Sequence, residues 1–425
     1  MPVAVFAIIA TVLFAISAPI FLAILVPTIV SFELFGPPIP STVLAQKMMQ
    51  GINKFSLLAI PLFIFAADII SRGEIGKRLI KLVESMIGHI TGGVAITTAV
   101  TCALFGAISG VGAAAVVSIG PIVYPALIRQ GYSRGFAVGL ILSASTLAML
   151  IPPSVAMILY SLQTLSSVGS VFLGGLAAGL IFTVLLAAYS YVYARIRGIG
   201  RLEKASWNER LTNLRRSGWA LGLPAIIFGG IYTGTFTPTE AAAGACVYAM
   251  VIETLVYRQI RVRDLFKVSQ ASAATIATLL ILITAGSVMT YYMTIENVPQ
   301  AISVGLEGRT AFEVLLLINV LFLIAGMIVD PNSAIIVLTP LIFPAAEALG
   351  IDAVHLGTVV VLNVAIGMIS PPFGLNLFIG MMTFKVPYWE AAKSVWPFIL
   401  VALVALAIVT YVPELVMWLP RLSMG

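Results

Sequence analysis

Long apolar stretches alternate with short polar connections along the whole chain. They run at about 3–31, 54–71, 91–128, 136–162, 167–194, 217–257, 269–293, 311–349, 354–382 and 392–418. A helix needs about 20 apolar residues to span a membrane, so this pattern predicts an all-α polytopic membrane protein with roughly ten crossings. Composition agrees, because 60% of the residues are apolar and only 9% are charged. An ordinary soluble domain has about 25% charged residues.

Two stretches, 91–128 and 311–349, are nearly twice the length of a span, and each is interrupted at its centre. The first breaks at 109–112 (sequence SGVG) and the second at 330–332 (sequence DPN). A helix interrupted in mid-membrane has unpaired backbone groups that lipid cannot satisfy. We therefore predict two re-entrant helical hairpins, whose tips face protein or a water-filled cavity.

The two halves of the sequence match each other without a gap after a shift of 219 residues. The matched positions are Pro19 with Pro238, Pro121 with Pro340, Pro125 with Pro344, Gly131 with Gly350, Met149 with Met368, and Pro152-Pro153 with Pro371-Pro372. Only 23 of the 425 residues are prolines, so these matches indicate an internal duplication. We predict a first repeat at 1–200, with a hairpin at 91–128 and a broken helix at 136–162, and a second at 217–425, with a hairpin at 311–349 and a broken helix at 354–382.

Loop charges predict how the two repeats lie in the membrane. The connection at 201–216 is expected to be cytoplasmic, because it and its flank contain seven basic residues: Arg195, Arg197, Arg201, Lys204, Arg210, Arg215 and Arg216. Basic residues also flank the first hairpin, whereas the second is flanked by five acidic residues and one arginine, Arg309. The repeats are therefore predicted to have inverted topology, as in secondary transporters.

In each repeat the hairpin tip is expected to meet a helix interrupted by a double proline, at 150–154 (LIPPS) and 369–376 (ISPPFGLN). Two adjacent prolines remove two N–H donors and free carbonyl groups one turn earlier. Freed carbonyls and half-helix C-terminal ends suit Na⁺, whereas half-helix N-termini suit a carboxylate. A double proline can also simply kink a helix. Two such pairs in register across the repeat favour binding sites.

Asp330 is the most informative single residue, because a carboxylate in mid-membrane is costly unless it faces a cavity or a partner. It could cap the helix that follows, since Asp-Pro-Asn resembles an N-cap with proline at the first helical position, and it could contact a polar solute. Ser109, Ser154 and Asn376 lie beside the breaks. Each could hydrogen-bond solute or only the local backbone.

Other function classes fit the sequence less well, and the chain is predicted not to be an enzyme. His89 and His355 are too far apart for a histidine metal site, and no nucleotide-binding or hydrolase motif occurs. An intramembrane aspartyl protease would need Asp68 and Asp330, but neither lies in a GxGD setting. Asp68 precedes Arg72 by four residues, which favours a surface ion pair. A passive channel is disfavoured, because two closed tips resemble an occluded site.

Two segments with interleaved charged and apolar residues predict helices that lie at the membrane surface. The longer runs over 72–88, and a shorter counterpart runs over 297–310. Such helices could brace a fixed scaffold or only connect spans at the surface.

Three motifs carry a family resemblance: GTFTPTEAA at 234–242, PPFGLNLF at 371–378 and IPPS at 151–154. With these motifs the whole chain resembles the large membrane subunit of TRAP transporters. The resemblance implies an elevator-type secondary transporter in the bacterial inner membrane, with no cofactor and with Na⁺ as the coupling ion. It also implies two partners, a small four-helix membrane subunit and a periplasmic solute-binding protein. Solutes of the family are typically organic acids such as C4-dicarboxylates or sialic acid.

The resemblance also implies site residues. One Na⁺ site, between the first tip and the first double proline, would use Gly106, Ser109, Ala148, Ile151 and Pro153. The second site would use Gly326, Gly367, Ser370 and Phe373. The solute would lie between the two sites, near Ser109, Ser154, Asp330 and Asn376. The first site departs from the usual family pattern, in which Ser-Gly-Ser forms the tip and glycine stands in place of Ala148.

The alternative is a stand-alone divalent-anion/Na⁺ symporter of the same architecture, which needs no binding protein. The motif at 234–242 favours the TRAP transporter over this symporter. The sequence does not name the solute, and no arginine lies in mid-membrane to bind a second carboxylate.

Overall fold

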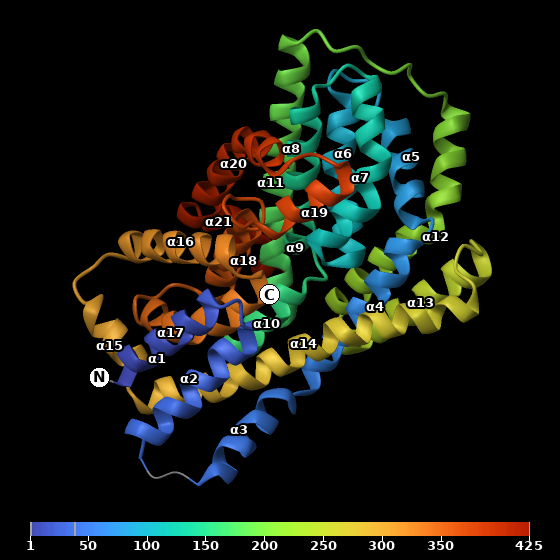
Figure 1. Cartoon of the computed structure of the whole chain (residues 1–425). Coiled ribbons are helices and arrows are strands. Elements are labelled where there is room, and N and C mark those ends of the chain that lie inside the picture. The colour runs from blue at the N-terminus through green and yellow to red at the C-terminus, as the bar shows by residue number, and fades with distance from the viewer. Residues whose placement is uncertain (1, 38–39, 425) are drawn as a thin grey trace.

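The computed structural model describes residues 2–37 and 40–424, and these residues form helices and no strands (Figure 1). Among them, eight helices are long and apolar enough to cross a membrane, or nine if the bent pair Arg134–Leu150 and Val155–Thr164 counts as one span. The predicted all-α polytopic class is therefore confirmed. The expected number of about ten crossings is slightly higher, partly because the stretches at 3–31 and 354–382 each form two helices that are too short for this count.

The first half of the chain, blue to green in Figure 1, contains helices α1 to α11. Their bounds are α1 (Pro2–Ala15), α2 (Ile20–Phe35), α3 (Ser41–Ile52), the 3-10 helix η1 (Phe55–Leu58), α4 (Ala59–Arg72), α5 (Ile75–Ile87), α6 (Gly93–Ser109), α7 (Gly112–Arg129), α8 (Arg134–Ser145), α9 (Leu147–Leu150), α10 (Val155–Thr164) and α11 (Val168–Ile196).

The second half, green to red, contains helices α12 to α21. Their bounds are α12 (Trp207–Tyr232), α13 (Pro238–Val251), the π-helix η2 (Ile252–Val256), α14 (Val262–Ile295), α15 (Val298–Gly305), α16 (Ala311–Ile328), α17 (Pro331–Ala348), α18 (Ala353–Gly367), α19 (Leu375–Phe384), α20 (Tyr388–Tyr411) and α21 (Glu414–Met424).

The two halves contain a matching succession of elements. A shift of 219 residues carries α7 onto α17 end to end, and it brings α10 to within one residue of α19. The same shift places α3 and α4 on the single long helix α14. The inversion of the halves across the membrane and their division at 201–216 stay predictions.

Both predicted hairpin breaks are confirmed. The first hairpin turns at Gly110, whose left-handed backbone (φ +63°) ends α6. This conformation favours glycine, and a Cβ here would also collide with the carbonyl oxygen of Pro153. The second hairpin turns at Asp330, whose side chain caps α17 and precedes Pro331 at the first helical position.

Both double prolines interrupt a helix, as predicted. The first interruption runs from Leu150 to Val155, with a bend of 42° between the flanking helices. The second separates the end of α18 at Gly367 from the start of α19 at Leu375. Proline lacks the N–H that a continuing helix needs, so each helix ends before its proline pair.

The two halves interlock through their broken helices. α10 of the first half packs against α17 of the second hairpin, and α19 of the second half packs against α7 of the first hairpin. The Tyr160 hydroxyl donates to the carbonyl of Ala353 over 2.8 Å, and Asn376 Nδ2 donates to Ser145 Oγ over 2.9 Å. Each hairpin is thus held by a broken helix from the other half.

Further helices flank this core. α14, which crosses the lower part of Figure 1, packs along α2, α3 and α4, and α13 packs against α4. α13 begins after a turn at Gly234 (φ +71°), where Thr237 and Glu240 form a capping box in which each side chain binds the other's backbone N–H. The motif at 234–242 therefore encodes the start of this helix.

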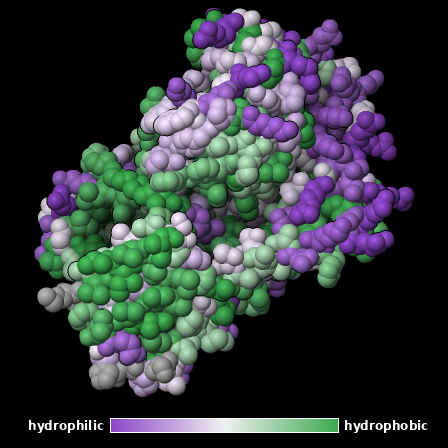
Figure 2. Space-filling view, viewed as in Figure 1, coloured by the Kyte–Doolittle hydropathy of each residue, from purple (hydrophilic) through white to green (hydrophobic). Residues whose placement is uncertain are grey.

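The amphipathic helix predicted at 72–88 is α5, whose apolar face packs against α6 and α12. At its N-terminus, the N–H groups of Glu74 and Ile75 donate to the fully buried carboxylate of Glu253, at 3.0 to 3.2 Å. Hydrophilic residues cover the side of the molecule that contains α5 and α12, whereas the surface over α1 and α2 is hydrophobic (Figure 2). The weaker counterpart predicted at 297–310 contains the short helix α15.

Candidate functional site

A cavity of about 430 Å³ lies between the two hairpin tips, the two broken helices and the helices α4 and α14. Figure 2 shows a hollow in the middle of this face of the molecule. Most of the lining is apolar or glycine backbone. The polar side chains of the lining are Asp68, Ser71, Thr275, Asp330 and Asn332.

The start of a half-helix lies at the cavity in four places, and two of these starts have no side-chain cap. Gly112, Val155, Pro331 and Leu375 are the first residues of α7, α10, α17 and α19, and all four line the cavity. Ser154 caps α10 and Asp330 caps α17, whereas α7 and α19 have no side-chain cap. In α19, however, the N–H groups of Asn376 and Leu377 already donate to the carbonyls of Met368 and Gly374, both at 2.9 Å. Free N–H groups and the helix dipole make an end such as the start of α7 suited to an anion, whereas α19 contributes mainly its dipole.

Asp330 serves as the predicted N-cap. Its Oδ2 accepts the N–H groups of Asn332 and Ser333, both at 3.1 Å, and its Oδ1 accepts the Ser333 hydroxyl. The carboxylate is half-buried and lines the cavity. The capping role is therefore confirmed, and the solute contact stays a prediction.

The other three residues predicted to contact solute are buried directly behind the lining. Ser154 Oγ accepts the N–H of Met157 at 3.4 Å, so this side chain caps α10. Ser109 precedes the lining residue Gly110, and Asn376 follows the lining residue Leu375. The Oγ of Ser109 and the Oδ1 of Asn376 are both buried, and neither has a hydrogen-bond partner among the described residues.

The first candidate Na⁺ site is assembled where the first tip meets the first broken helix. A Cβ on Gly106 would lie 2.6 Å from the Cα of Ala148, so the two backbones are in direct contact. Gly110, one residue after Ser109, contacts the carbonyl of Pro153. The Gly106 carbonyl accepts the N–H of Gly110 at 3.0 Å and retains a second lone pair.

The second candidate Na⁺ site has the same construction. A Cβ on Gly326 would lie 3.3 Å from the Cα of Gly367, so the second hairpin lies directly against the second broken helix. The carbonyls of Gly367 and Ser370 accept one hydrogen bond each, at 2.9 and 3.1 Å, within the turn that contains the double proline. The side chain of Phe373 is exposed, so this residue offers only its backbone. Carbonyl oxygens of this kind suit a monovalent cation.

No group of three His, Cys, Asp or Glu side chains that could hold a metal ion occurs among the described residues. The carbonyl groups at the two tips therefore fit Na⁺ better than a transition metal.

Asp68 was misinterpreted from the sequence. Its Oδ2 accepts the hydroxyl of Ser272 in α14 at 2.5 Å, and the side chain lines the cavity. Arg72 is exposed and forms no ion pair with Asp68, since the salt bridge found in the described residues joins Lys77 to Glu74. The spacing of four residues permits a pair, but α4 turns Asp68 toward α14 instead. The signal in the sequence was a lone carboxylate inside an apolar stretch.

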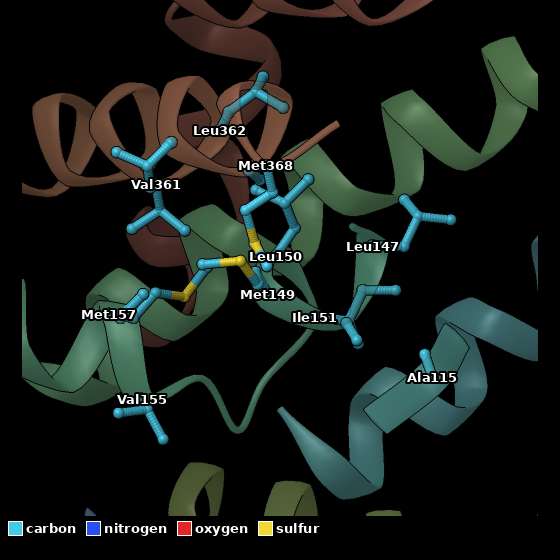
Figure 3. Close-up of a cluster of buried hydrophobic side chains, with 14 of the residues drawn as sticks. Ala115, Leu147, Met149, Leu150, Ile151, Val155, Met157, Val361, Leu362 and Met368 are labelled. Atoms are coloured by element: carbon cyan, nitrogen blue, oxygen red, sulfur yellow. The ribbon is translucent and has the colours of Figure 1, made fainter. Parts of the chain in front are cut away.

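Two methionines that the repeat relates to each other, Met149 and Met368, both line the cavity. Figure 3 shows them with Leu150 and Ile151 at the break in the first broken helix. They give the cavity an apolar part beside the polar tips, which suits a solute that is not polar over its whole surface.

Comparison with known proteins identifies the family. The family described as "Tripartite ATP-independent periplasmic transporter, DctM component" matches residues 7–415. The chain belongs to this family. It is 41% identical to the ectoine TRAP transporter large permease protein TeaC of Halomonas elongata over 394 residues, which are 92% of each protein. It is 38% identical to the C4-dicarboxylate TRAP transporter large permease protein DctM of Rhodobacter capsulatus, with 93% of each protein covered.

The fold also matches a solved transporter. The crystal structure of the YdaH transporter from Alcanivorax borkumensis superimposes with a TM-score of 0.69, covering 97% of this chain and 99% of that one. The two sequences are 14% identical, so the likeness is one of fold.

Membership of the DctM family establishes the general role of the chain as the large permease subunit of a TRAP transporter. Such a subunit is a multi-pass membrane protein that works with a small membrane subunit and a periplasmic binding protein. The family consists of permeases and not of enzymes, which removes the aspartyl protease alternative even though Asp68 and Asp330 line one cavity.

Proposed function

We propose that this DctM-family permease takes up a small carboxylate solute across the bacterial inner membrane, coupled to the entry of Na⁺. The periplasmic binding protein delivers the solute, and the small membrane subunit completes the transporter. The observation that carries the proposal is the cavity between the hairpin tips, which the uncapped N-terminus of α7 and the start of α19 line beside two carbonyl-rich turns. The helix N-termini bind the carboxylate, and the carbonyls bind Na⁺.

The Na⁺ ions act by closing the sites at the tips. In each half, the carbonyl-rich turn belongs to the broken helix, and the opposite wall belongs to the hairpin. A cation held between them would draw the hairpin tip onto the broken helix and complete the solute site. Solute and Na⁺ therefore stabilise the same arrangement, which is the thermodynamic requirement for coupling.

Relatives support a carboxylate but not one particular solute. TeaC is named for ectoine and the Rhodobacter capsulatus DctM for C4-dicarboxylates. The two solutes share a carboxylate and differ in the rest of their charge. The shared group is the one for which the uncapped helix N-termini are suited.

Reconstituted vesicles test the coupling. With the partner subunits present, uptake of labelled solute should require an inward Na⁺ gradient, because the tips provide carbonyl sites and the described lining of the cavity contains no histidine for a proton relay. K⁺ replaces Na⁺ at the same membrane potential as the control. Uptake that continues unchanged in K⁺ would contradict the proposal.

A further inference from the structure

The charged side chains of the cavity restrict which second charged group the solute can have in addition to its carboxylate. Two acidic side chains, Asp68 and Asp330, line the cavity, and no Lys, Arg or His is found among its described lining residues. A second carboxylate on the solute would therefore meet carboxylates and no fixed cation. Like charges placed together cost free energy, so such a lining selects against a dianion.

The two acids are not equivalent. Asp330 already accepts two backbone N–H groups and a hydroxyl at the start of α17. Asp68 accepts one hydrogen bond, from Ser272 to its Oδ2, and no described residue donates to its Oδ1. A carboxylate at this depth of a membrane protein is costly unless a partner or water compensates its charge. Asp68 therefore lines the cavity with one carboxylate oxygen that has no donor among the described residues.

The carboxylate-binding groups lie on another wall of the cavity. Asp68, Ser71 and Thr275 come from α4 and α14, whereas the uncapped helix ends at Gly112 and Leu375 belong to the hairpin and the second broken helix. Behind those ends, the buried Oδ1 of Asn376 has no partner, and its Nδ2 lies 3.4 Å from the position of a Cβ on Gly112. Asp68 thus lies on the wall formed by α4 and α14, whereas the helix ends lie on the other elements, together with Asp330, whose carboxylate is already bonded as the cap of α17.

We infer that Asp68 selects a zwitterionic solute, whose cationic nitrogen it binds while the uncapped end of α7 holds the carboxylate. This inference rests on the proposed carboxylate transport and names the second group of the solute. An amidinium or ammonium carboxylate fits the lining, and a dicarboxylate does not. Asp68 is thereby a specificity-determining residue in α4, outside both hairpins and both broken helices.

Solute binding by the purified chain with its small subunit tests the inference. Ectoine serves as the amidinium carboxylate and succinate as the dianion, each titrated in saturating Na⁺ with the unfolding temperature as the readout. The wild type should bind ectoine more tightly than succinate. Asp68→Asn keeps the size of the side chain and an acceptor for Ser272 but removes the charge. This change should weaken the binding of ectoine more than about tenfold and should not weaken the binding of succinate.

Asp352→Asn is the matched control. It makes the same chemical change at the N-cap of α18, away from the cavity lining, and asparagine still caps a helix. This variant should still bind ectoine more tightly than succinate. Asp68→Glu should do the same, because it keeps the charge. A single cooperative unfolding transition shows that each variant is folded.

Two results would overturn the inference: a wild type that binds succinate at least as tightly as ectoine, or an Asp68→Asn variant with unchanged ectoine affinity. The first comparison needs no variant, so it decides even if Asp68→Asn does not fold. The vesicle experiment with Na⁺ and K⁺ separates the two proposals. Ectoine uptake that is independent of Na⁺ but sensitive to Asp68 would contradict the coupling and leave the specificity intact.

Discussion

At the scale of single residues, Asp330 combines a structural and a chemical role. Its carboxylate holds the first N–H groups of α17 and also lines the cavity. Asp330→Ala should cost about 1 kcal/mol of stability through loss of the cap, and transport should fall sharply while the protein is still expressed. Asp330→Asn keeps a capping side chain and removes the charge. If Asn restores stability but not uptake, the charge matters for transport; uptake at the wild-type level in the Ala variant would contradict the transport role.

Gly110 is the second residue on which the cavity depends. Gly110→Ala places a methyl group against the Pro153 carbonyl, in a left-handed conformation that costs about 1 kcal/mol or more for a non-glycine residue. The first tip should then be displaced from the broken helix, and Na⁺ should stabilise the variant less than the wild type in thermal unfolding. Gly131→Ala is the control, since Gly131 is also left-handed (φ +91°) but has open space around its Cβ position. If both changes reduced the stabilisation by Na⁺ equally, the effect would come from backbone strain alone and not from the contact with Pro153.

Residue roles were predictable where they follow from local sequence. The cap at Asp330 could be predicted, because an Asp-Pro pair at a break has a defined local structure. The position of Asp68 could not, because its partner Ser272 is 204 residues away and only the packing of α4 on α14 brings the two together. The solute contacts of Ser109, Ser154 and Asn376 remain predictions, with all three side chains directly behind the lining.

At the scale of secondary structure, the N-terminus of α5 depends on one distant side chain. The buried carboxylate of Glu253 accepts the N–H groups of Glu74 and Ile75 and thereby joins α5 to η2, which follows α13. Glu253→Ala should lower stability by about 1.5–3 kcal/mol, the range for a hydrogen bond to a charged group. Hydrogen exchange should increase first at the start of α5. Glu347→Ala, at an exposed position late in α17, should leave exchange in α5 unchanged; no difference between the two variants would contradict the anchoring role.

The element boundaries at the hairpins and broken helices were predictable to within a few residues, because glycine and proline mark them in the sequence. The apolar stretch at 3–31 was different. It contains two helices, separated between Ala15 and Ile20, where Ser17 has a left-handed backbone (φ +60°). Hydropathy averages over such a turn when the flanking residues are equally apolar, so the break is invisible in that measure.

At the scale of the whole molecule, the packing of α10 on α17 and of α19 on α7 joins the two hairpins into one body. No sequence pattern predicts that each broken helix packs on the hairpin of the other half. The matched prolines show which segments correspond and not which segments are in contact. α20 packs against α8 and strengthens the connection between the halves. The flanking helices α2, α3, α4 and α13 meet each other or α14, which suits a frame against which that body could move.

The interlocked packing leads us to predict that both hairpins and both broken helices move as one unit during transport. An elevator mechanism requires such a unit to shift against a fixed frame. The alternative is a rocking motion in which the two halves of the chain separate from each other. The two mechanisms differ in which distances stay constant.

Distances between paired spin labels test this claim most directly, in a background where the buried Cys102 and Cys246 are replaced by alanine. One pair joins the hairpins, at Ile128 in α7 and Leu321 in α16, and the other joins Ile128 to Ile281 in α14; all three side chains are exposed. Between inward- and outward-facing conditions, the distance between the hairpins should stay constant, and the distance from hairpin to α14 should change by several ångströms. A change in the distance between the hairpins, with the distance to α14 constant, would contradict the account.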